Sequence, residues 1–196
     1  MSEAMTSGAG SLRRIGAGWR WSLATIVVVA LWMTMYFASR MLEYEAFASL
    51  WFPPAAVSFA AFMVFRSRAW PALVLANVLG ALATFHREGV TVAGSMLFDG
   101  LLFALAHCIA YWLAAEAVLQ SIPRNSAPSM ARTVGAFLFA GMISALIASV
   151  AGAWVTLSVE LVSAGDMWPL VLPWLIGDYA GLIATGPLLV LVLRRF

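Results

Sequence analysis

Three acidic side chains stand inside long apolar stretches of this sequence: Asp99, Glu116 and Asp178. If those stretches cross a membrane, each acid is a candidate functional residue, because ionisable groups at membrane depth are costly and rare. Glu116 lies near the end of its stretch, so we expect it to reach the interface or to pair with Arg124 or Arg132. Asp99 and Asp178 are the stronger candidates for a binding site.

The depths of these two acids predict that they meet. Asp99 follows the start of its apolar stretch by roughly 12 Å at helical rise, and Asp178 does so by roughly 15 Å. Asn77 lies midway along another stretch, and His107 lies two turns after Asp99 on a similar helix face. Together they predict an outward-open pocket for a proton or for a small cationic or hydrogen-bonding ligand. The alternative, which stays open, is that they are polar contacts between helices.

The sequence offers no catalytic or metal-binding pattern. His86 and His107 would be separated by roughly 20 Å along the membrane normal, which is too far for one haem iron. Cys108 is the single cysteine, so no internal disulfide can form. There is no phosphate-binding loop, nucleophile elbow or metal-spaced His/Cys set. We therefore expect no enzymatic activity, no cofactor and no metal.

The composition excludes a water-soluble domain. Apolar residues make up 63% of the 196 residues and charged residues only 10%, whereas soluble domains average about 25% charged. Lipid tolerates such a surface and favours helices, whose backbone hydrogen bonds are internal. The net charge of +2 is too small to indicate nucleic acid as a partner. We predict an all-α integral membrane protein, with the lipid bilayer that surrounds it as one of its partners.

The apolar runs predict a bundle of about six transmembrane helices. The runs cover residues 21–39, 51–65, about 69–85, about 92–119, about 132–159 and 168–193. Pro53, Pro54 and Pro71 fall where helices begin, a position that tolerates proline. Residues 1–20 are expected to be a flexible cytoplasmic segment, and residues 21–196 the membrane-embedded domain. Arg40 follows the first run where a signal peptide would carry small residues, so we expect this run to be retained.

The arginines predict the orientation. All eleven basic residues are arginine, and with the N-terminus inside, nine of them fall on the inner side. Only Arg40 and Arg87 fall outside. Because cytoplasmic loops are enriched in basic residues, both termini are predicted to lie in the cytoplasm.

Small residues at helical spacing predict close helix contacts. They are Gly141, Ala145 and Gly152 in the fifth run, and Gly177 and Gly181 in the sixth. We expect them to pack the bundle, and self-association as a homodimer stays open.

Two motifs carry a family resemblance. The first begins with Trp-Phe-Pro-Pro-Ala at 51–55, continues with Arg-Ser-Arg-Ala-Trp-Pro at 66–71 and ends at Asn77. The second joins Trp174, Gly177, Asp178 and Gly181 to Gly-Pro-Leu at 186–188. In this order they resemble the bacterial membrane-associated sensor (MASE type one) domain. The chain departs from that pattern in having Ala56 where glycine is frequent and Asp99 where an uncharged polar residue is usual.

The resemblance implies a sensory input domain in the bacterial inner (plasma) membrane. Such a domain would detect an extracytoplasmic or intramembrane stimulus and relay it to a histidine kinase or diguanylate cyclase, and so to two-component or cyclic di-GMP signalling. That output would lie beyond this chain or on a partner, the ligand would be a small molecule, and Trp174 of the second motif would join the pocket. Two other functions stay open: a small-solute or proton transporter or channel, and a structural membrane subunit that anchors a partner.

Overall fold

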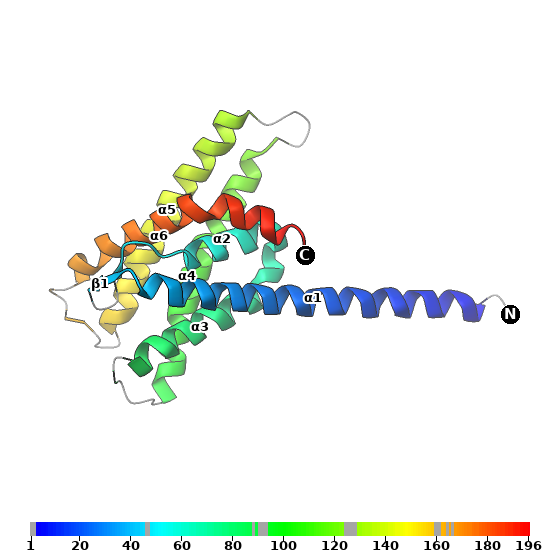
Figure 1. Cartoon of the computed structure of the whole chain (residues 1–196), viewed down its shortest axis with the longest axis horizontal. Helices are drawn as coiled ribbons and strands as arrows, with labels where there is room; N and C mark the ends of the chain where they lie inside the picture. The colour runs from blue at the N-terminus through cyan, green and yellow to red at the C-terminus, as the bar shows by residue number, and fades with distance from the viewer. Residues whose placement is uncertain are drawn as a thin grey trace.

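The computed structural model describes residues 3–45, 48–87, 89, 94–123, 129–158, 162–163, 165 and 167–196. Helices dominate it, with one short antiparallel strand pair (Figure 1). In chain order the elements are α1 (Glu3–Arg40), β1 (Glu43–Glu45), β2 (Ala48–Ser49), α2 (Pro54–Phe65), the 3-10 turn η1 (Arg66–Ala69), α3 (Trp70–Arg87), α4 (Gly94–Ser121), α5 (Met130–Ser158) and α6 (Met167–Leu193).

Five helical segments are long and apolar enough to cross a membrane. They are Trp21–Arg40, Pro54–Arg87, Leu97–Ser121, Met130–Ser158 and Met167–Leu193. Large apolar side chains cover the outside of these helices, as for Phe139 (72% exposed) and Leu188 (63% exposed), which lipid tolerates and water does not. The chain is therefore a predominantly helical, multi-pass membrane protein. The sequence predicts about six spans, whereas five helical segments qualify here. The two counts differ because α2 and α3 were predicted as separate spans.

α2 is too short to span on its own. Its 12 residues cover about 18 Å, whereas the hydrocarbon core is about 30 Å thick. The predicted span began at residue 51, but the helix begins at Pro54 with Pro53 as its N-cap. Each proline lacks an N–H and disfavours helix in the residue before it, so the helix cannot extend backwards through the pair. α2 is buried from Pro54 to Phe62 and contacts α1, α4 and α6.

The backbone that precedes α2 lies in a notch on α6. The Phe52 N–H donates to the Gly177 carbonyl oxygen at 2.9 Å. A Cβ at Gly177 would overlap the Ser49 carbonyl oxygen, and one at Gly181 would overlap that of Phe52. Both glycines thus leave room for an extended segment, whereas their spacing in the sequence predicts contacts between helices. Non-helical backbone at membrane depth is tolerated only where protein encloses it, and α6 provides that enclosure.

α5 and α6 pack closely through small residues. A Cβ at Gly141 would lie 2.6 Å from Leu182 Cδ2, and one at Gly152 would lie 2.6 Å from Trp174 Cζ3. Ala145, between them on α5, is fully buried. All three small residues of the predicted α5 stripe therefore lie inside the bundle.

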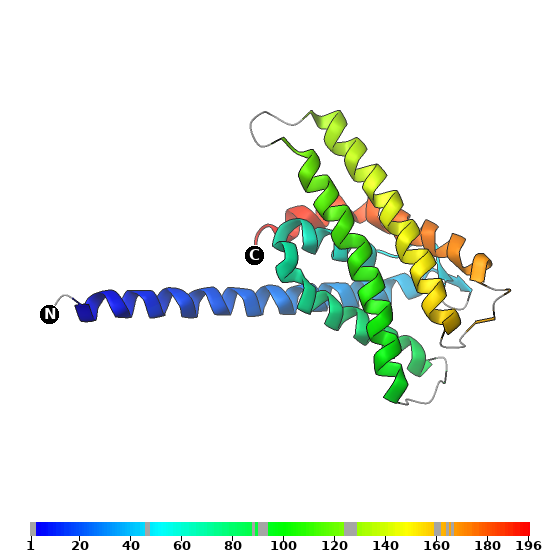
Figure 2. The same ribbon diagram turned by 180° about the vertical axis from the view of Figure 1, so that it is seen from behind.

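α1 is much longer than the predicted first span. It begins at Glu3 and runs unbroken to Arg40, whereas the sequence analysis placed a flexible segment over residues 1–20. No proline occurs before Pro53, so nothing in this region forbids helical hydrogen bonding. The N-terminal part of α1 projects away from the bundle in both views (Figures 1 and 2).

The α2–α3 turn carries charged contacts. Arg66 caps α2 at φ 57°, with its N–H bonded to the Phe62 carbonyl oxygen, and its guanidinium lies 3.4 Å from Glu116. The predicted partner Arg124 lies outside the described residues, and Arg66, which was not predicted, pairs with Glu116. The Arg68 guanidinium lies over the Trp21 ring, 4.7 Å from its centroid. The C-terminus lies beside this turn (Figures 1 and 2).

Candidate functional site

A cavity of about 120 Å³ opens among the helices at the end opposite the α2–α3 turn. Its lining comes from α1, α3, α4, α5 and α6 together with Glu43, Ser49 and Phe52 of the segment before α2. An engineered cavity of about 150 Å³ in another protein binds benzene, so this volume is in the range that suits a small organic molecule.

The deep end of the cavity is polar. Asp178 of α6 is 6% exposed, and its Oδ2 accepts a hydrogen bond of 2.8 Å from the fully buried Tyr111 hydroxyl. The Asn77 amide of α3 donates to the Leu73 carbonyl oxygen at 2.9 Å and approaches Cys108 Sγ at 3.8 Å. α3, α4 and α6 thus each deliver a polar group to one buried region.

His107 is the least satisfied of these groups. It lines the cavity, is 6% exposed, and has its Nε2 atom buried without a hydrogen-bond partner. Its ring packs on Tyr111, with centroids 4.7 Å apart, and edge-on to Phe52 at 6.1 Å. Because an unpaired buried polar atom costs roughly 1–3 kcal/mol, this nitrogen favours a binding partner.

Aromatic rings form the walls. Trp32 and Tyr36 of α1 stack at 5.7 Å with an interplanar angle of 11°, and Phe103 meets Trp174 edge-to-face at 5.6 Å. Trp32 reaches its place because α3 has a glycine there: a Cβ at Gly80 would lie 2.6 Å from Trp32 Cζ3. Trp32 Nε1 donates to Ser58 Oγ of α2 at 3.1 Å, which fixes the indole.

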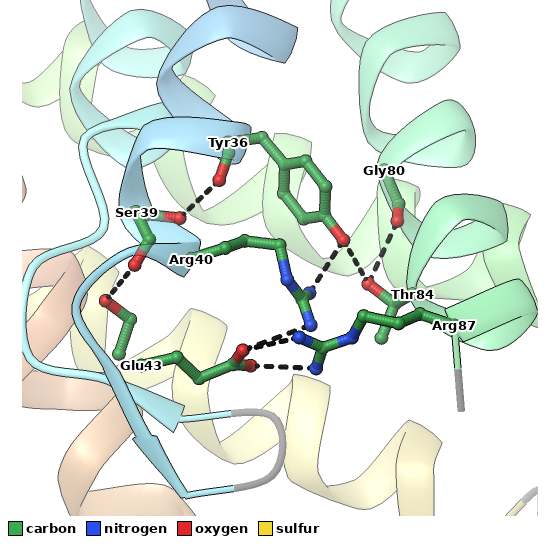
Figure 3. Close-up of polar contacts among 8 residues, drawn as sticks. Tyr36, Ser39, Arg40, Glu43, Gly80, Thr84 and Arg87 are labelled. Carbon is green, nitrogen blue, oxygen red and sulfur yellow. Dashed lines mark hydrogen bonds and ion pairs between the residues drawn. The ribbon is translucent and has the colours of Figure 1, made fainter.

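Charged side chains meet at the mouth (Figure 3). The Glu43 carboxylate accepts two hydrogen bonds from the Arg87 guanidinium, at 2.8 and 3.3 Å. It also forms an ion pair with Arg40 at 3.1 Å. Arg40 donates to the Tyr36 hydroxyl at 2.8 Å, and that hydroxyl lies 2.6 Å from Thr84 Oγ1. One carboxylate therefore joins the outer ends of α1 and α3.

The Ser49 side chain links the segment before α2 to α1. Ser49 Oγ lies 2.8 Å from the Ser39 carbonyl oxygen and 2.9 Å from that of Trp51. Figure 3 shows Ser39 on α1 next to the Tyr36–Arg40 cluster, with its own hydroxyl bonded to the Tyr36 carbonyl oxygen at 2.7 Å. The mouth and the docked segment are thus one connected structure.

Four of the five predicted pocket residues line this cavity: Asn77, His107, Trp174 and Asp178. Asp99 does not belong to the lining; it lies partly exposed on α4, one turn before Phe103. Six further residues of the site are not predicted from the sequence pattern: Trp32, Tyr36, Arg40, Glu43, Thr84 and Tyr111. Tyr111 could have been found, because it follows His107 by one helical turn on the same face.

Over the described parts of the chain, no group of three or more His, Cys, Asp or Glu side chains is placed to hold a metal ion. Cys108 is fully buried beside Asn77. The chemistry that the site offers is the noncovalent binding of a small molecule by polar groups at the deep end and aromatic walls.

Comparison with known proteins gives no match. No protein-family model matches the chain, and neither a curated protein nor a solved structure is significantly similar to it.

Proposed function

We propose that this chain is a sensory input domain of a bacterial inner membrane. A small ligand enters the cavity from the extracytoplasmic side and shifts the packing of the helices. A histidine kinase or diguanylate cyclase, beyond this chain or on a partner, reads that shift in the cytoplasm. The observation that carries the proposal is the cavity, in which polar groups from three helices converge behind aromatic walls. Largely apolar pockets with a few convergent polar groups are typical of ligand sites.

The inner part of the bundle favours sensing over conduction. Between the cavity and the α2–α3 turn, the core holds large buried apolar side chains from three helices: Phe59 and Phe62 of α2, Leu73 of α3 and Val118 of α4. This packing closes the inner end, as expected of a receptor site that holds its ligand.

α6 is the proposed output element. It carries Trp174 and Asp178 into the cavity and ends beside the α2–α3 turn. Its glycine notch also holds the segment that includes the cavity residue Phe52. A ligand that contacts these groups differently in two packings biases the equilibrium between them, and helix shifts of about 1–2 Å are a common form of such signals.

The charge distribution supports cytoplasmic termini. Arg66 and Arg68 belong to the α2–α3 turn, and Arg194 and Arg195 belong to the C-terminus. The C-terminus and this turn lie side by side (Figures 1 and 2). Arg40 and Arg87, at the opposite end, share Glu43. Under the positive-inside rule the first end is cytoplasmic. The segment before α2 together with α2 then makes the second of six crossings, and α3 the third.

The resemblance to the MASE type one domain supports the same function. Within its second motif, Trp174 and Asp178 line the cavity, while Gly177 and Gly181 form the notch. The motif therefore links the cavity to the glycine notch on α6. Such a link is required if ligand binding is to change the packing of this helix.

The test is a fusion of Phe196 to a diguanylate cyclase reporter, with cyclic di-GMP measured while candidate small molecules are added outside. We expect ligand-dependent output. Ala148→Leu, which fills part of the cavity, should make the output insensitive to ligand. Ala184→Leu, at an exposed position of α6, should behave as wild type. Output that stays constant under every compound, in the wild-type fusion, would count against sensing.

A second function, transport, is favoured by one observation. The second crossing is broken into an extended part and the short α2, and discontinuous helices line substrate sites in many transporters. It predicts that proteoliposomes containing the pure protein accumulate or release a solute or protons. Proteoliposomes that pass neither solute nor protons, together with a reporter fusion that responds to ligand, would favour sensing over transport.

A further inference from the structure

We infer that the ligand of the cavity is a small organic amine in its cationic form. The ammonium group would lie at the deep end, against Asp178 and His107, with its apolar part between the aromatic walls. This inference rests on the proposed ligand-sensing function and names the chemical class of the ligand.

Asp178 is the first argument. Its carboxyl accepts one hydrogen bond, from Tyr111, and within the described ranges no arginine or histidine lies within ion-pair distance of it. A buried carboxylate is stabilised by a cation that also donates hydrogen bonds. Asp178 belongs to the lining of the cavity, so a ligand ammonium can supply both the charge and the donors.

His107 is the second, independent argument. Its buried Nε2 has no partner. In a neutral imidazole one ring nitrogen donates a hydrogen bond and the other accepts one, so Nε2 is the acceptor when the proton is on Nδ1. Both residues line the cavity, and an ammonium group carries several N–H donors, which suit a carboxylate and an accepting ring nitrogen. A carboxylate ligand would instead place a second negative charge beside Asp178.

The walls are the third argument. Trp32, Tyr36, Phe52, Phe103 and Trp174 surround the space in front of these two residues. Aromatic faces attract organic cations, tryptophan most strongly, and the attraction grows when the cation is desolvated. The same rings also accommodate the apolar part of an amine.

The mouth does not favour an anion, although it contains arginines. Arg40 and Arg87 both contact Glu43, so an incoming carboxylate would have to displace a carboxylate already bound to two arginines. The remaining acid of the lining is Asp178. The site is therefore selective for positive charge at its deep end.

The test compares three ligands that share one ring: benzylamine, benzyl alcohol and benzoate. Calorimetric titration of the whole chain in lipid nanodiscs gives the three dissociation constants. We expect benzylamine to bind about tenfold or more tightly than benzyl alcohol, as a charge-assisted bond to a buried carboxylate requires, and benzoate to bind most weakly. Equal affinity for amine and alcohol, tighter binding of benzoate, or no benzylamine binding up to millimolar concentration would overturn the inference.

The Asp178→Asn variant tests whether the preference for the amine over the alcohol depends on the Asp178 carboxylate. The amide keeps an acceptor for the Tyr111 hydroxyl but removes the charge, so the amine-to-alcohol preference should fall by about tenfold or more. Asp99→Asn is the matched control, because it makes the same change on α4 outside the lining and should keep the preference. A preference that survives Asp178→Asn in folded protein contradicts the assignment. The wild-type comparison needs no variant, so misfolding cannot decide the result.

The two proposals fail differently. If amine and alcohol bind equally while the reporter fusion still responds to another compound, the ligand class is wrong and sensing stands. If benzylamine binds with the expected selectivity while the fusion stays silent under every ligand, the amine site stands and sensing is wrong.

Discussion

At the scale of single residues, the bond between Tyr111 and Asp178 joins α4 to α6 inside the core. Both side chains are buried, and the 2.8 Å bond satisfies the hydroxyl while giving the carboxyl one partner. In surroundings of low dielectric such a bond is strong, and its loss leaves a buried carboxyl without compensation. This pair therefore contributes to stability as well as to the site.

Tyr111→Phe is expected to lower the free energy of unfolding by about 1–3 kcal/mol, because it leaves the Asp178 carboxyl unpaired. Tyr179→Phe is the control: it removes a hydroxyl whose bond to the Leu138 carbonyl oxygen is longer, at 3.3 Å, and exposed. That change should cost no more than about 0.5 kcal/mol. Reversible unfolding in mixed detergent micelles measures both, and equal losses would contradict the role given to Tyr111.

The polar residues of the site could be predicted from the sequence better than its aromatic residues. Asp178 and His107 are conspicuous because a polar group in an apolar run demands an explanation. Trp32 and Tyr36 are not conspicuous, since aromatics are common in membrane spans. Arg40 and Arg87 are predicted to lie outside the membrane, which stays a prediction. Their shared contact with Glu43 depends on how α1 and α3 end, which one-dimensional patterns do not specify.

At the scale of elements, the notch on α6 holds the segment that precedes the short helix α2. Gly177 and Gly181 lie one turn apart, and each lets a carbonyl of the preceding segment approach the helix. The boundaries of α5 and α6 agreed with the predicted runs within a few residues. The boundary of α2 did not, because hydropathy alone does not distinguish an enclosed extended segment from helix.

Gly181→Ala should displace the segment before α2, because the added Cβ would lie 2.5 Å from the Phe52 carbonyl carbon and 2.8 Å from Pro53 N. We expect a loss of stability of about 1–3 kcal/mol and faster proteolysis between β2 and α2. Gly135→Ala, on α5 with no atom within 4 Å, should be neutral or slightly stabilising. Limited proteolysis of the two variants in parallel checks this, and identical digestion rates would argue against the notch.

At the scale of the whole molecule, charge is unevenly divided between the two ends of the bundle. The end with the α2–α3 turn carries arginines in contact with Glu116 and Trp21. The other end carries two arginines that share one glutamate. This asymmetry underlies the proposed orientation, and with it the side from which a ligand reaches the cavity.

Single cysteines test the orientation. Cys108 is fully buried, so the wild-type chain should react little with a membrane-impermeant maleimide. We expect Met41→Cys, at a position 86% exposed, to be labelled in intact cells. Ser67→Cys, exposed in the α2–α3 turn, should be labelled only after permeabilisation. The reverse pattern would invert the topology and turn the cavity toward the cytoplasm.

The dependence of the short α2 on α6 has a consequence for biogenesis. A segment with 12 helical residues and an extended stretch before them cannot partition into lipid alone, because its free N–H and C=O groups would be stranded there. Its docking surface is made only when α6 is synthesised, long after α2 has left the ribosome. The translocon or an insertase must therefore keep α2 and the segment before it out of the lipid until α6 is made. Assembly of the bundle is then completed by the insertion of α6, the last helix of this chain.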